Sequence, residues 1–259
     1  MPDKINLLFA LSLTPELMIQ YFRSKGYALS WNWEDVWQQQ HNQAFTVAKV
    51  MKLDLLKDIR EIVDNYIAGN IYYDDAVEQL TLKLRAKGWW GKQEQANLKT
   101  GEKEVVQLGS PWRVKRILET NMIVANSQGK YKTQIDAVSF APYWRYRDRD
   151  DSRVRDLHRA IGQIFKTGVL IYSHPFWDTW YPPNDWGCRC WVENYTERQA
   201  LERSLKIYTA DEFNESLNAV LKRFGITTPP AEWAYNAGAT AWTPDLTQYP
   251  PDLIEGVGL

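Results

Sequence analysis

The chain has 259 residues, and its 31 lysines and arginines nearly balance 32 aspartates and glutamates, for a formal net charge of −1. That balance excludes a strongly basic nucleic-acid coat and an acidic disordered tail as the overall character of the protein. Hydrophobic residues make up 44% of the chain and charged residues 24%, the usual mixture of a globular protein. The 13 tryptophans are unusual, and rings of this size predict tightly packed cores or adhesive interfaces.

The first segments of the chain predict helices and no membrane span. The apolar run Ile5–Leu13 is far shorter than the ~20 residues that cross a bilayer, and it lacks the flanks of a signal peptide. We therefore expect a buried strand or a docking arm there, in a protein that folds in the cytoplasm. Thr14-Pro15-Glu16 is typical of a helix start, and Gly26 is expected to end that helix.

Helical spacing continues through the N-terminal half. From Asn32 to about Ala68 apolar residues recur at helical intervals without glycine or proline, which predicts one long helix or two. His41 lies on this stretch as a helix-face residue. Asp74 or Asp75 is expected to cap a third helix that Gly88 closes.

The middle of the chain contains the best candidate for a domain boundary. The polar run at 92–103 follows two tryptophans and a glycine, and it predicts a loop or a two-stranded flap. Ser110-Pro111 is a second helix start, with a capping hydroxyl and proline in the first turn. That helix is expected to reach Asn126 and to continue past Gly129 into Gln134.

After Pro142 the pattern changes to short strands and short helices. Aromatic and basic residues alternate at 143–147, as they do in a half-buried strand. The other expected elements are strands at 169–172 and 190–195, a helix that Asp151 or Ser152 caps, a capping box from Thr196 to Gln199, and a helix at 210–224.

The chain ends in a proline-rich segment that carries several aromatic residues. Five prolines fall after Thr227, and proline at that density prevents regular structure. We expect an extended arm that is either disordered or wraps a partner, and its aromatic residues favour wrapping. The fold class is therefore α+β: a mainly helical N-terminal half, a small mixed C-terminal domain with short antiparallel strands, and the arm. The predicted divisions are 1–91, 92–109, 110–225 and 226–259.

Two cysteines, Cys188 and Cys190, are one residue apart. A disulfide at that spacing is strained, so the pair does not indicate a secreted disulfide framework. On a strand the two thiols would face the same side, and with His158 or His174 they could hold a zinc ion. The competing interpretation is that they are buried structural cysteines, which behave as small hydrophobes, and that no cofactor is bound.

Alternating charges surround the region before these cysteines. Four carboxylates could form a two-metal site of a nuclease-like enzyme, with His158 as a general base. Arginines alternate with these carboxylates, however, and paired charges are the favoured interpretation. No motif of a known nucleophile or phosphate-binding loop occurs, so no catalytic residue is assigned. The carboxylates are Asp148, Asp150, Asp151 and Asp156.

Basic residues with nearby aromatic rings could contact DNA or a partner protein. A solvated helix face is the competing interpretation. The candidate contact residues are Arg113, Lys115, Arg116, Lys130 and Lys132 on the central helix, and Trp233 and Trp242 in the arm.

Several motifs together resemble the Mu F-like minor head proteins of tailed bacteriophages. The resemblance spans roughly residues 10–195 and rests mainly on the segments 151–158, 175–178, 181–184 and 186–190. The family motif residues are Asp151, Arg153, Arg155, His158, Pro182, Pro183, Trp186, Gly187, Cys188, Arg189 and Cys190.

The resemblance implies a low-copy virion component inside the phage head. Such a protein is expected to bind the portal or the major capsid protein, or both, and to contact DNA during packaging or ejection. It implies no membrane partner and no enzymatic activity. The alternative is the metal-dependent, nuclease-like enzyme built on His158, Cys188, Cys190 and the carboxylates between Asp148 and Asp156.

Overall fold

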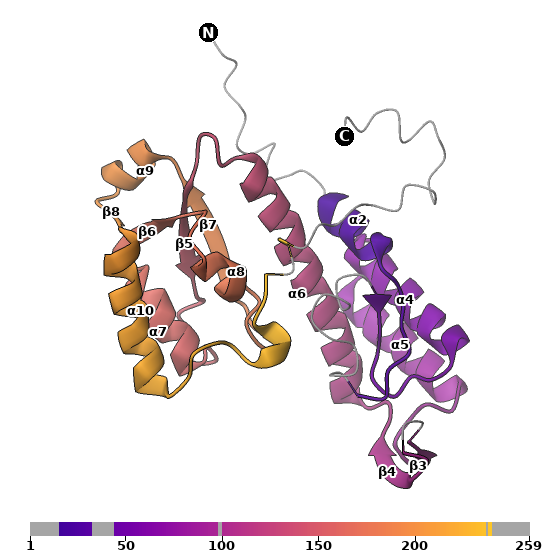
Figure 1. The fold of residues 1–259 in the computed structure, drawn as a ribbon. Helices are drawn as coiled ribbons and strands as arrows, with labels where there is room; N and C mark the ends of the chain where they lie inside the picture. Colours follow the sequence, from indigo (N-terminus) through magenta and orange to yellow (C-terminus); the bar gives the residue numbers. More distant parts are fainter. Residues whose placement is uncertain (1–15, 33–43, 98–99, 237, 240–259) are drawn as a thin grey trace.

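The computed structural model describes residues 16–32, 44–97, 100–236 and 238–239. The long helix α6 (Pro111–Asp136) runs through the middle of the molecule (Figure 1). Three N-terminal helices lie on one side of it, and a four-stranded sheet with its covering helices lies on the other (Figure 1). This arrangement confirms the predicted α+β class.

The first hydrophobic core is helical. Helices α2 (Glu16–Ser24), α4 (Leu53–Ile67) and α5 (Tyr73–Ala86) each bury one apolar face. The first half of α6 completes this core with Val114 and Leu118, both fully buried. The helix predicted after Thr14 and the one predicted to end at Gly88 are thereby confirmed. Asp74 and Asp75 lie in the first turn of α5, where Tyr72 is the N-cap residue, so their predicted capping role was wrong.

The helical stretch predicted from Asn32 to Ala68, as one helix or two, is confirmed at Leu53–Ile67 and was wrong at residues 44–52. Strand β2 (Ala44–Phe45) pairs in parallel with β1 (Gly26–Tyr27), and α4 begins only at Leu53. Phe45 is buried edge-on against Phe22, with ring centroids 5.6 Å apart. This tertiary contact holds the segment in an extended conformation despite its helical spacing. Residues 33–43, including His41, lie outside the described residues.

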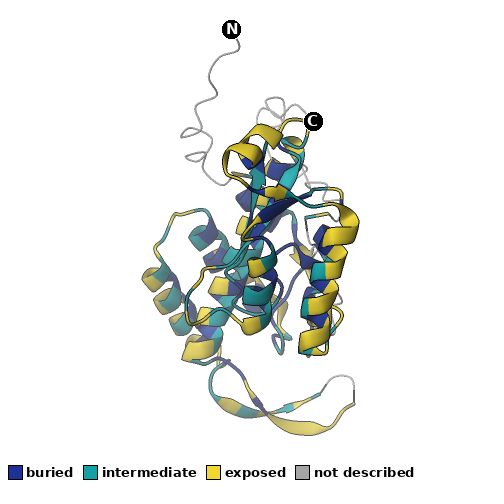
Figure 2. Cartoon of the chain, turned by 90° about the vertical axis from the view of Figure 1, so that its left-hand side faces the viewer, coloured by how far each residue is buried: buried dark blue, intermediate teal, exposed yellow. Residues whose placement is uncertain are grey.

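A hairpin connects the N-terminal helices to α6. Strands β3 (Lys92–Ala96) and β4 (Lys103–Gln107) pair antiparallel, which confirms the flap alternative. The hairpin projects from the body with most of its surface exposed (Figure 2).

Helix α6 begins and extends as predicted. The Ser110 hydroxyl accepts a hydrogen bond from the Arg113 backbone N–H at 3.2 Å, and Pro111 occupies the first turn. The helix continues through Gly129, where a Cβ atom would lie 3.1 Å from the backbone nitrogen of Met18 in α2. The glycine therefore permits close contact between α2 and α6.

The sheet of the second half has the order β7-β5-β6-β8. The central strand β5 (Tyr143–Arg147) is antiparallel to both β6 (Gly168–Ile171) and β7 (Trp191–Tyr195), as expected. A two-residue strand, β8 (Lys206–Ile207), adds to β6 in the parallel direction and was not predicted.

Helices α7 (Asp156–Ile164), α8 (Phe176–Trp180) and α10 (Ala210–Phe224) pack around an aromatic core. Fully buried Trp144 and Phe165 are at its centre. The N-cap residue of α7 is Arg155, so the predicted cap at Asp151 or Ser152 was wrong.

The predicted ends of the last two helices are confirmed. A capping box of Thr196 and Gln199 starts α9 (Glu197–Glu202). The helix α10 ends at Gly225.

The first part of the predicted arm packs onto the body. A single 3₁₀ turn at Ala231–Trp233 places Trp233 edge-on against Trp186, with centroids 5.3 Å apart. The Asn236 backbone N–H donates to the Asp178 carbonyl at 2.7 Å. Residues 240–259, including Trp242, lie outside the described residues.

The predicted domain divisions stay a prediction. Helix α6, which belongs to the predicted division 110–225, contributes residues to both hydrophobic cores. Among the described helices, none combines the length and the apolar composition needed to cross a bilayer.

We expect Gly129→Leu to destabilise the chain. The added side chain would meet the α2 backbone at Met18, and overpacking of this kind costs about 1–3 kcal/mol. Urea unfolding should show this decrease in the free energy of unfolding. Lys115→Leu, on an exposed position of α6, is the matched control. Equal stability of the two variants would contradict the proposed close contact.

Candidate functional site

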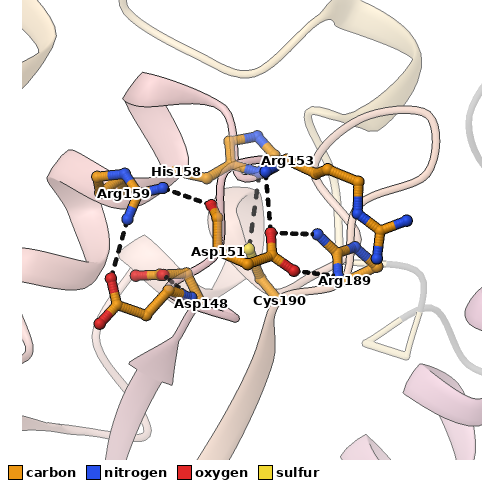
Figure 3. A network of polar contacts seen from close by, with 8 residues as sticks. Asp148, Asp151, Arg153, His158, Arg159, Arg189 and Cys190 are labelled. Carbon is orange, nitrogen blue, oxygen red and sulfur yellow. Dashed lines mark hydrogen bonds and ion pairs between the residues drawn. The ribbon is translucent and has the colours of Figure 1, made fainter.

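The residues of the predicted family motif gather on one side of the second core. They come from the turn before α7, from α7 itself, and from the loop between α8 and β7. Figure 3 shows Asp151, Arg189, His158 and Cys190 close together at the centre of a polar network. The segments 151–158 and 182–190 are therefore neighbours in space.

Asp151 is the hub of this network. Its carboxylate accepts two hydrogen bonds from the guanidinium of Arg189, at 2.6 and 2.7 Å, in a bidentate pair (Figure 3). It also accepts the Arg153 backbone N–H at 3.0 Å, while its own backbone carbonyl accepts from Arg159 at 2.6 Å. The Arg189 partner lowers the pKa of Asp151 to about 2, and the carboxylate raises the pKa of Arg189.

A second arginine ties the same two segments together. Arg155 forms an ion pair of 2.9 Å with Asp185 and donates to the Trp186 carbonyl at 2.6 Å. The side chain of Arg153 is exposed, in contrast. Of the three motif arginines, Arg155 and Arg189 thus fix the geometry of the loops.

The Pro182-Pro183 segment is buried against α6. The Ser127 hydroxyl donates to the Pro182 carbonyl. Next to it, fully buried Asn184 accepts a hydrogen bond from the Tyr146 hydroxyl at 3.2 Å. These contacts explain why the motif contains prolines and an asparagine at a position without solvent access.

Gly187 has a backbone conformation that favours glycine. Its φ of +65° lies in the left-handed region, which disfavours side chains. A Cβ atom there would lie 2.8 Å from the guanidinium of Arg116, which is the end of a flexible side chain and can move aside. The backbone of the turn into the cysteines is therefore the reason for glycine at this position.

His158, Cys188 and Cys190 form a compact cluster. The Sγ atoms of both cysteines lie 3.6 Å from Nδ1 of His158. His158 and Cys188 are buried, and Cys190 is partly buried. A hydrogen bond from Cys190 and the nearby imidazole lower the pKa of Cys188, whereas the same hydrogen bond and burial raise the pKa of Cys190.

The fourth zinc candidate, His174, is elsewhere. Its Nδ1 accepts the Phe176 backbone N–H at 3.1 Å, and its ring packs on Phe213. Burial lowers its pKa, although Asp178 opposes this effect. In the structure His174 has a packing role, and it does not join the cysteines.

The four candidate carboxylates do not converge. Asp148 accepts the Asp150 backbone N–H, Asp150 pairs with Arg159 at 2.9 Å, and Asp156 is exposed at the start of α7. In the described part of the chain, His158, Cys188 and Cys190 form the one group of ligand atoms that lie close enough together to hold a metal ion. The described residues thus do not show the alternative two-metal arrangement of carboxylates, and the pairs of Asp150 with Arg159 and of Asp151 with Arg189 agree with the favoured interpretation.

Arg113 is committed to the interior of the fold. Its guanidinium donates to the backbone carbonyls of Ala48, at 2.7 Å, and Gln107, at 2.6 Å, and it lies 4.7 Å from the ring centre of Trp89. Burial lowers its pKa to about 10. This residue connects α6 to the first core and the hairpin.

The other basic candidates on α6 differ in their freedom. Lys132 pairs with Asp136 at 3.2 Å. Lys115 and Lys130 are exposed. The pKa of Lys130 is nevertheless lowered, because its amine is partly desolvated and the charge of Arg149 repels it. No continuous basic stripe is formed by these residues.

Two cavities of about 310 Å³ flank the motif loop. The first is lined by both cysteines, Ser127, Lys130 and Arg149. The second lies between α6 and the first core and is lined mainly by apolar atoms. We call the second the Trp112 groove; its lining includes Val47, Trp112, Arg116, Ile117 and Trp186.

Sequence reasoning missed two residues that hold the site together. Gln134 of α6 donates to the Val192 carbonyl at 2.7 Å and accepts from the Tyr181 hydroxyl at 2.8 Å. Arg145 of β5 donates to the carbonyls of Phe165 and Lys166 at the end of α7. The only available signal was a polar residue on an otherwise buried helix face, or an arginine on an alternating strand.

Comparisons with known proteins indicate the family of the chain. Residues 75–193 match the family model described as "Phage Mu protein F like protein". A "Putative capsid assembly protein F" of Escherichia phage Mu is 33% identical over 95% of this chain and 59% of its own length. A "Mu-like prophage FluMu F protein" of Haemophilus influenzae is 37% identical over 84% of this chain and 55% of its own length.

The chain is a Mu F-like phage protein, as the motif resemblance predicted. It spans more than half, but less than two thirds, of the length of these relatives. No solved structure matches it.

We expect the pKa of Asp151 to depend on Arg189. The ordinary value of an aspartate is about 3.9, and Arg189→Gln should move the pKa of Asp151 up towards it from about 2. Carboxyl NMR titration of the two proteins measures this shift. Asp54 on α4, whose pKa is lowered by a hydrogen bond from Lys87, is the internal control, and its pKa should be the same in both proteins.

The same ion pair should make stability depend on pH. Because the folded-state pKa is below the unfolded one, the contribution is complete above about pH 4 and is lost as pH falls from about 4 towards 2. The difference in stability between wild type and Arg189→Gln should therefore shrink over that range. A difference that stays constant with pH would contradict the pairing.

Proposed function

We propose that the chain works in assembly of a tailed-phage head, as a low-copy protein that binds the portal protein or the major capsid protein inside the head. The observation that carries this proposal is the similarity, over most of the chain, to a protein named as a capsid assembly protein. Binding to other head proteins is the corresponding biochemical activity, and contact with DNA is a further part of the proposal.

The polar network supports a binding role over turnover. Asp151 and Asp185 are neutralised by arginines, and Asn184 is buried in hydrogen bonds. A general acid or base needs a free proton-transfer atom within reach of a substrate. Asp151 and Asp185 instead hold loops in place, so the nuclease-like alternative receives no support from these two carboxylates.

The Trp112 groove is the surface we assign to partner binding. Trp112 is 65% exposed, although tryptophan is the side chain with most apolar area to bury. Arg116 lies over its ring, with 5.2 Å between the guanidinium carbon and the ring centre. Exposed tryptophan beside arginine is typical of residues that dominate binding energy.

The proposed occupant of the groove is a segment of a head-protein subunit. Its apolar side chain would fill the space between Trp112, Ile117 and Trp186, which line the groove. Acidic residues next to that side chain would face Arg116. This combination of an apolar anchor and opposite charge gives both affinity and orientation.

DNA contact has less support on α6 than partner binding. Arg113 and Lys132 are occupied by contacts within the chain, so fewer basic side chains are available for phosphates. If DNA is bound, affinity should fall steeply as salt rises. A flat response to salt would remove this part of the proposal.

We expect Trp112→Ala to reduce incorporation of the protein into heads. Loss of a central aromatic anchor typically costs about 2 kcal/mol or more, which is roughly a thirtyfold loss of affinity. Quantitative blotting of purified heads from a complementation assay measures the change.

Leu201→Ala is the matched control, because Leu201 is 64% exposed on α9 and outside the groove. It should leave incorporation unchanged. Normal incorporation of a folded Trp112→Ala variant would contradict the groove's role.

The end of the arm can be tested separately. Trp233 and Asn236 pack on the body, so truncation from Thr227 would also remove structural contacts. Truncation after Ala239 leaves those contacts in place. We expect it to keep the melting temperature and to lower head incorporation; unchanged incorporation would exclude residues 240–259 from partner binding.

A further inference from the structure

The His158–Cys188–Cys190 cluster is not explained by binding to head proteins. It joins two segments that are 30 residues apart in sequence: α7, which carries His158, and the approach to β7, which carries both cysteines. The ligand atoms of the three side chains all lie within 4.8 Å of one another. They therefore face a common point inside the protein.

The imidazole cannot form a hydrogen bond with both cysteines. Both Sγ atoms lie 3.6 Å from the same Nδ1 atom of His158. A neutral imidazole nitrogen carries either one hydrogen or one lone pair, so it can form one directed hydrogen bond and not two. A thiol is also a weak donor and a weak acceptor. The hydrogen bond between Cys188 and Cys190 is therefore a weak one, and it does not require a histidine at the same point.

A metal ion at the common point satisfies all three atoms. Zinc lies about 2.3 Å from cysteine sulfur and about 2.0–2.1 Å from histidine nitrogen, and tetrahedral angles then separate sulfur from nitrogen by about 3.6 Å. The two observed separations have that value. Two thiolates and an imidazole are, in addition, ligands that select zinc over magnesium or calcium.

We propose that His158, Cys188 and Cys190 bind one zinc ion. Binding converts both thiols to thiolates, and the protons that they lose pass to solvent. Within the described part of the chain, no fourth histidine, cysteine or carboxylate joins the group. The fourth ligand is a water molecule, for which the cavity of about 310 Å³ beside both cysteines provides room.

The ion would act as a structural link. It would fix α7 to the loop that carries Arg189, and so hold the Asp151–Arg189 pair in register. Because the unfolded chain has no preformed site, zinc binding adds directly to the stability of the folded state. The proposal does not depend on the role of the chain in head assembly.

Metal analysis of the purified full chain tests the proposal. The protein is expressed with zinc in the medium, desalted, and examined by plasma mass spectrometry for zinc per chain. We expect about one zinc ion per chain and a lower melting temperature after chelation. A zinc content below about 0.1 ion per chain, both in the protein as purified and after reconstitution with zinc chloride, would overturn the proposal.

Cobalt substitution in the wild-type protein identifies the ligands without any variant. Tetrahedral Co²⁺ bound by two thiolates should give a sulfur-to-cobalt charge-transfer band in the near ultraviolet. It should also give absorption bands of high intensity in the visible region. Absence of the charge-transfer band would overturn the assignment to the cysteines, whatever the zinc content.

Variants separate this site from the other histidine. Two variants should lose zinc. One carries both Cys188→Ser and Cys190→Ser, and the other carries His158→Asn alone. His174→Asn should keep it, because asparagine can accept the Phe176 N–H that His174 accepts. Zinc retained by the double cysteine variant, or lost only with His174, would place the ion elsewhere and refute the proposal.

Discussion

Helix α6 is the element on which the two halves of the molecule depend. Val114 and Leu118 in its first half are buried in the helical core, and Tyr131 and Ile135 in its second half pack against the aromatic core. A single continuous helix therefore fixes the distance and rotation between the cores. Ser110 starts the helix, and Gly129 lets α2 approach it. The motif loop then rests on this helix through Ser127 and Gln134.

The polar side chains of the motif loop have few unmet bonding requirements, and this property separates two kinds of function. Asp151 and Asp185 have arginine partners, and Asn184 is bonded in the interior. Side chains committed in this way set the shape of a surface. The exception is the His158–Cys188–Cys190 cluster, where one nitrogen faces two sulfurs. Three ligand atoms that converge on one buried point suit an ion, and not a protein partner.

Local signals allowed the sequence to predict most helices and the three main strands. Ser110-Pro111 and the Thr196–Gln199 box act through hydrogen bonds within one turn, so tertiary structure cannot easily override them. The segment around Phe45 was mispredicted because its burial against Phe22 decides its conformation. For the site, the sequence supplied two candidate histidines, and only the fold could choose between them. Likewise, Asp151 and Arg189 are 38 positions apart in the sequence, and no local pattern predicts that they pair.

The aromatic residues divide into two groups, and this division connects the fold to the proposed activity. Trp144 and Trp177 are buried in an edge-on contact, where they supply stability to the second core. Trp112 is exposed, and α6, the element that both cores hold rigid, carries it. A rigid anchor loses little conformational entropy on binding. In the proposed interaction, tryptophan at this position would contribute to binding affinity the apolar burial that the same ring elsewhere contributes to folding. The motif loop supplies Trp186 as the opposite wall of the groove, so the order of that loop, with or without an ion, determines the shape that a partner meets.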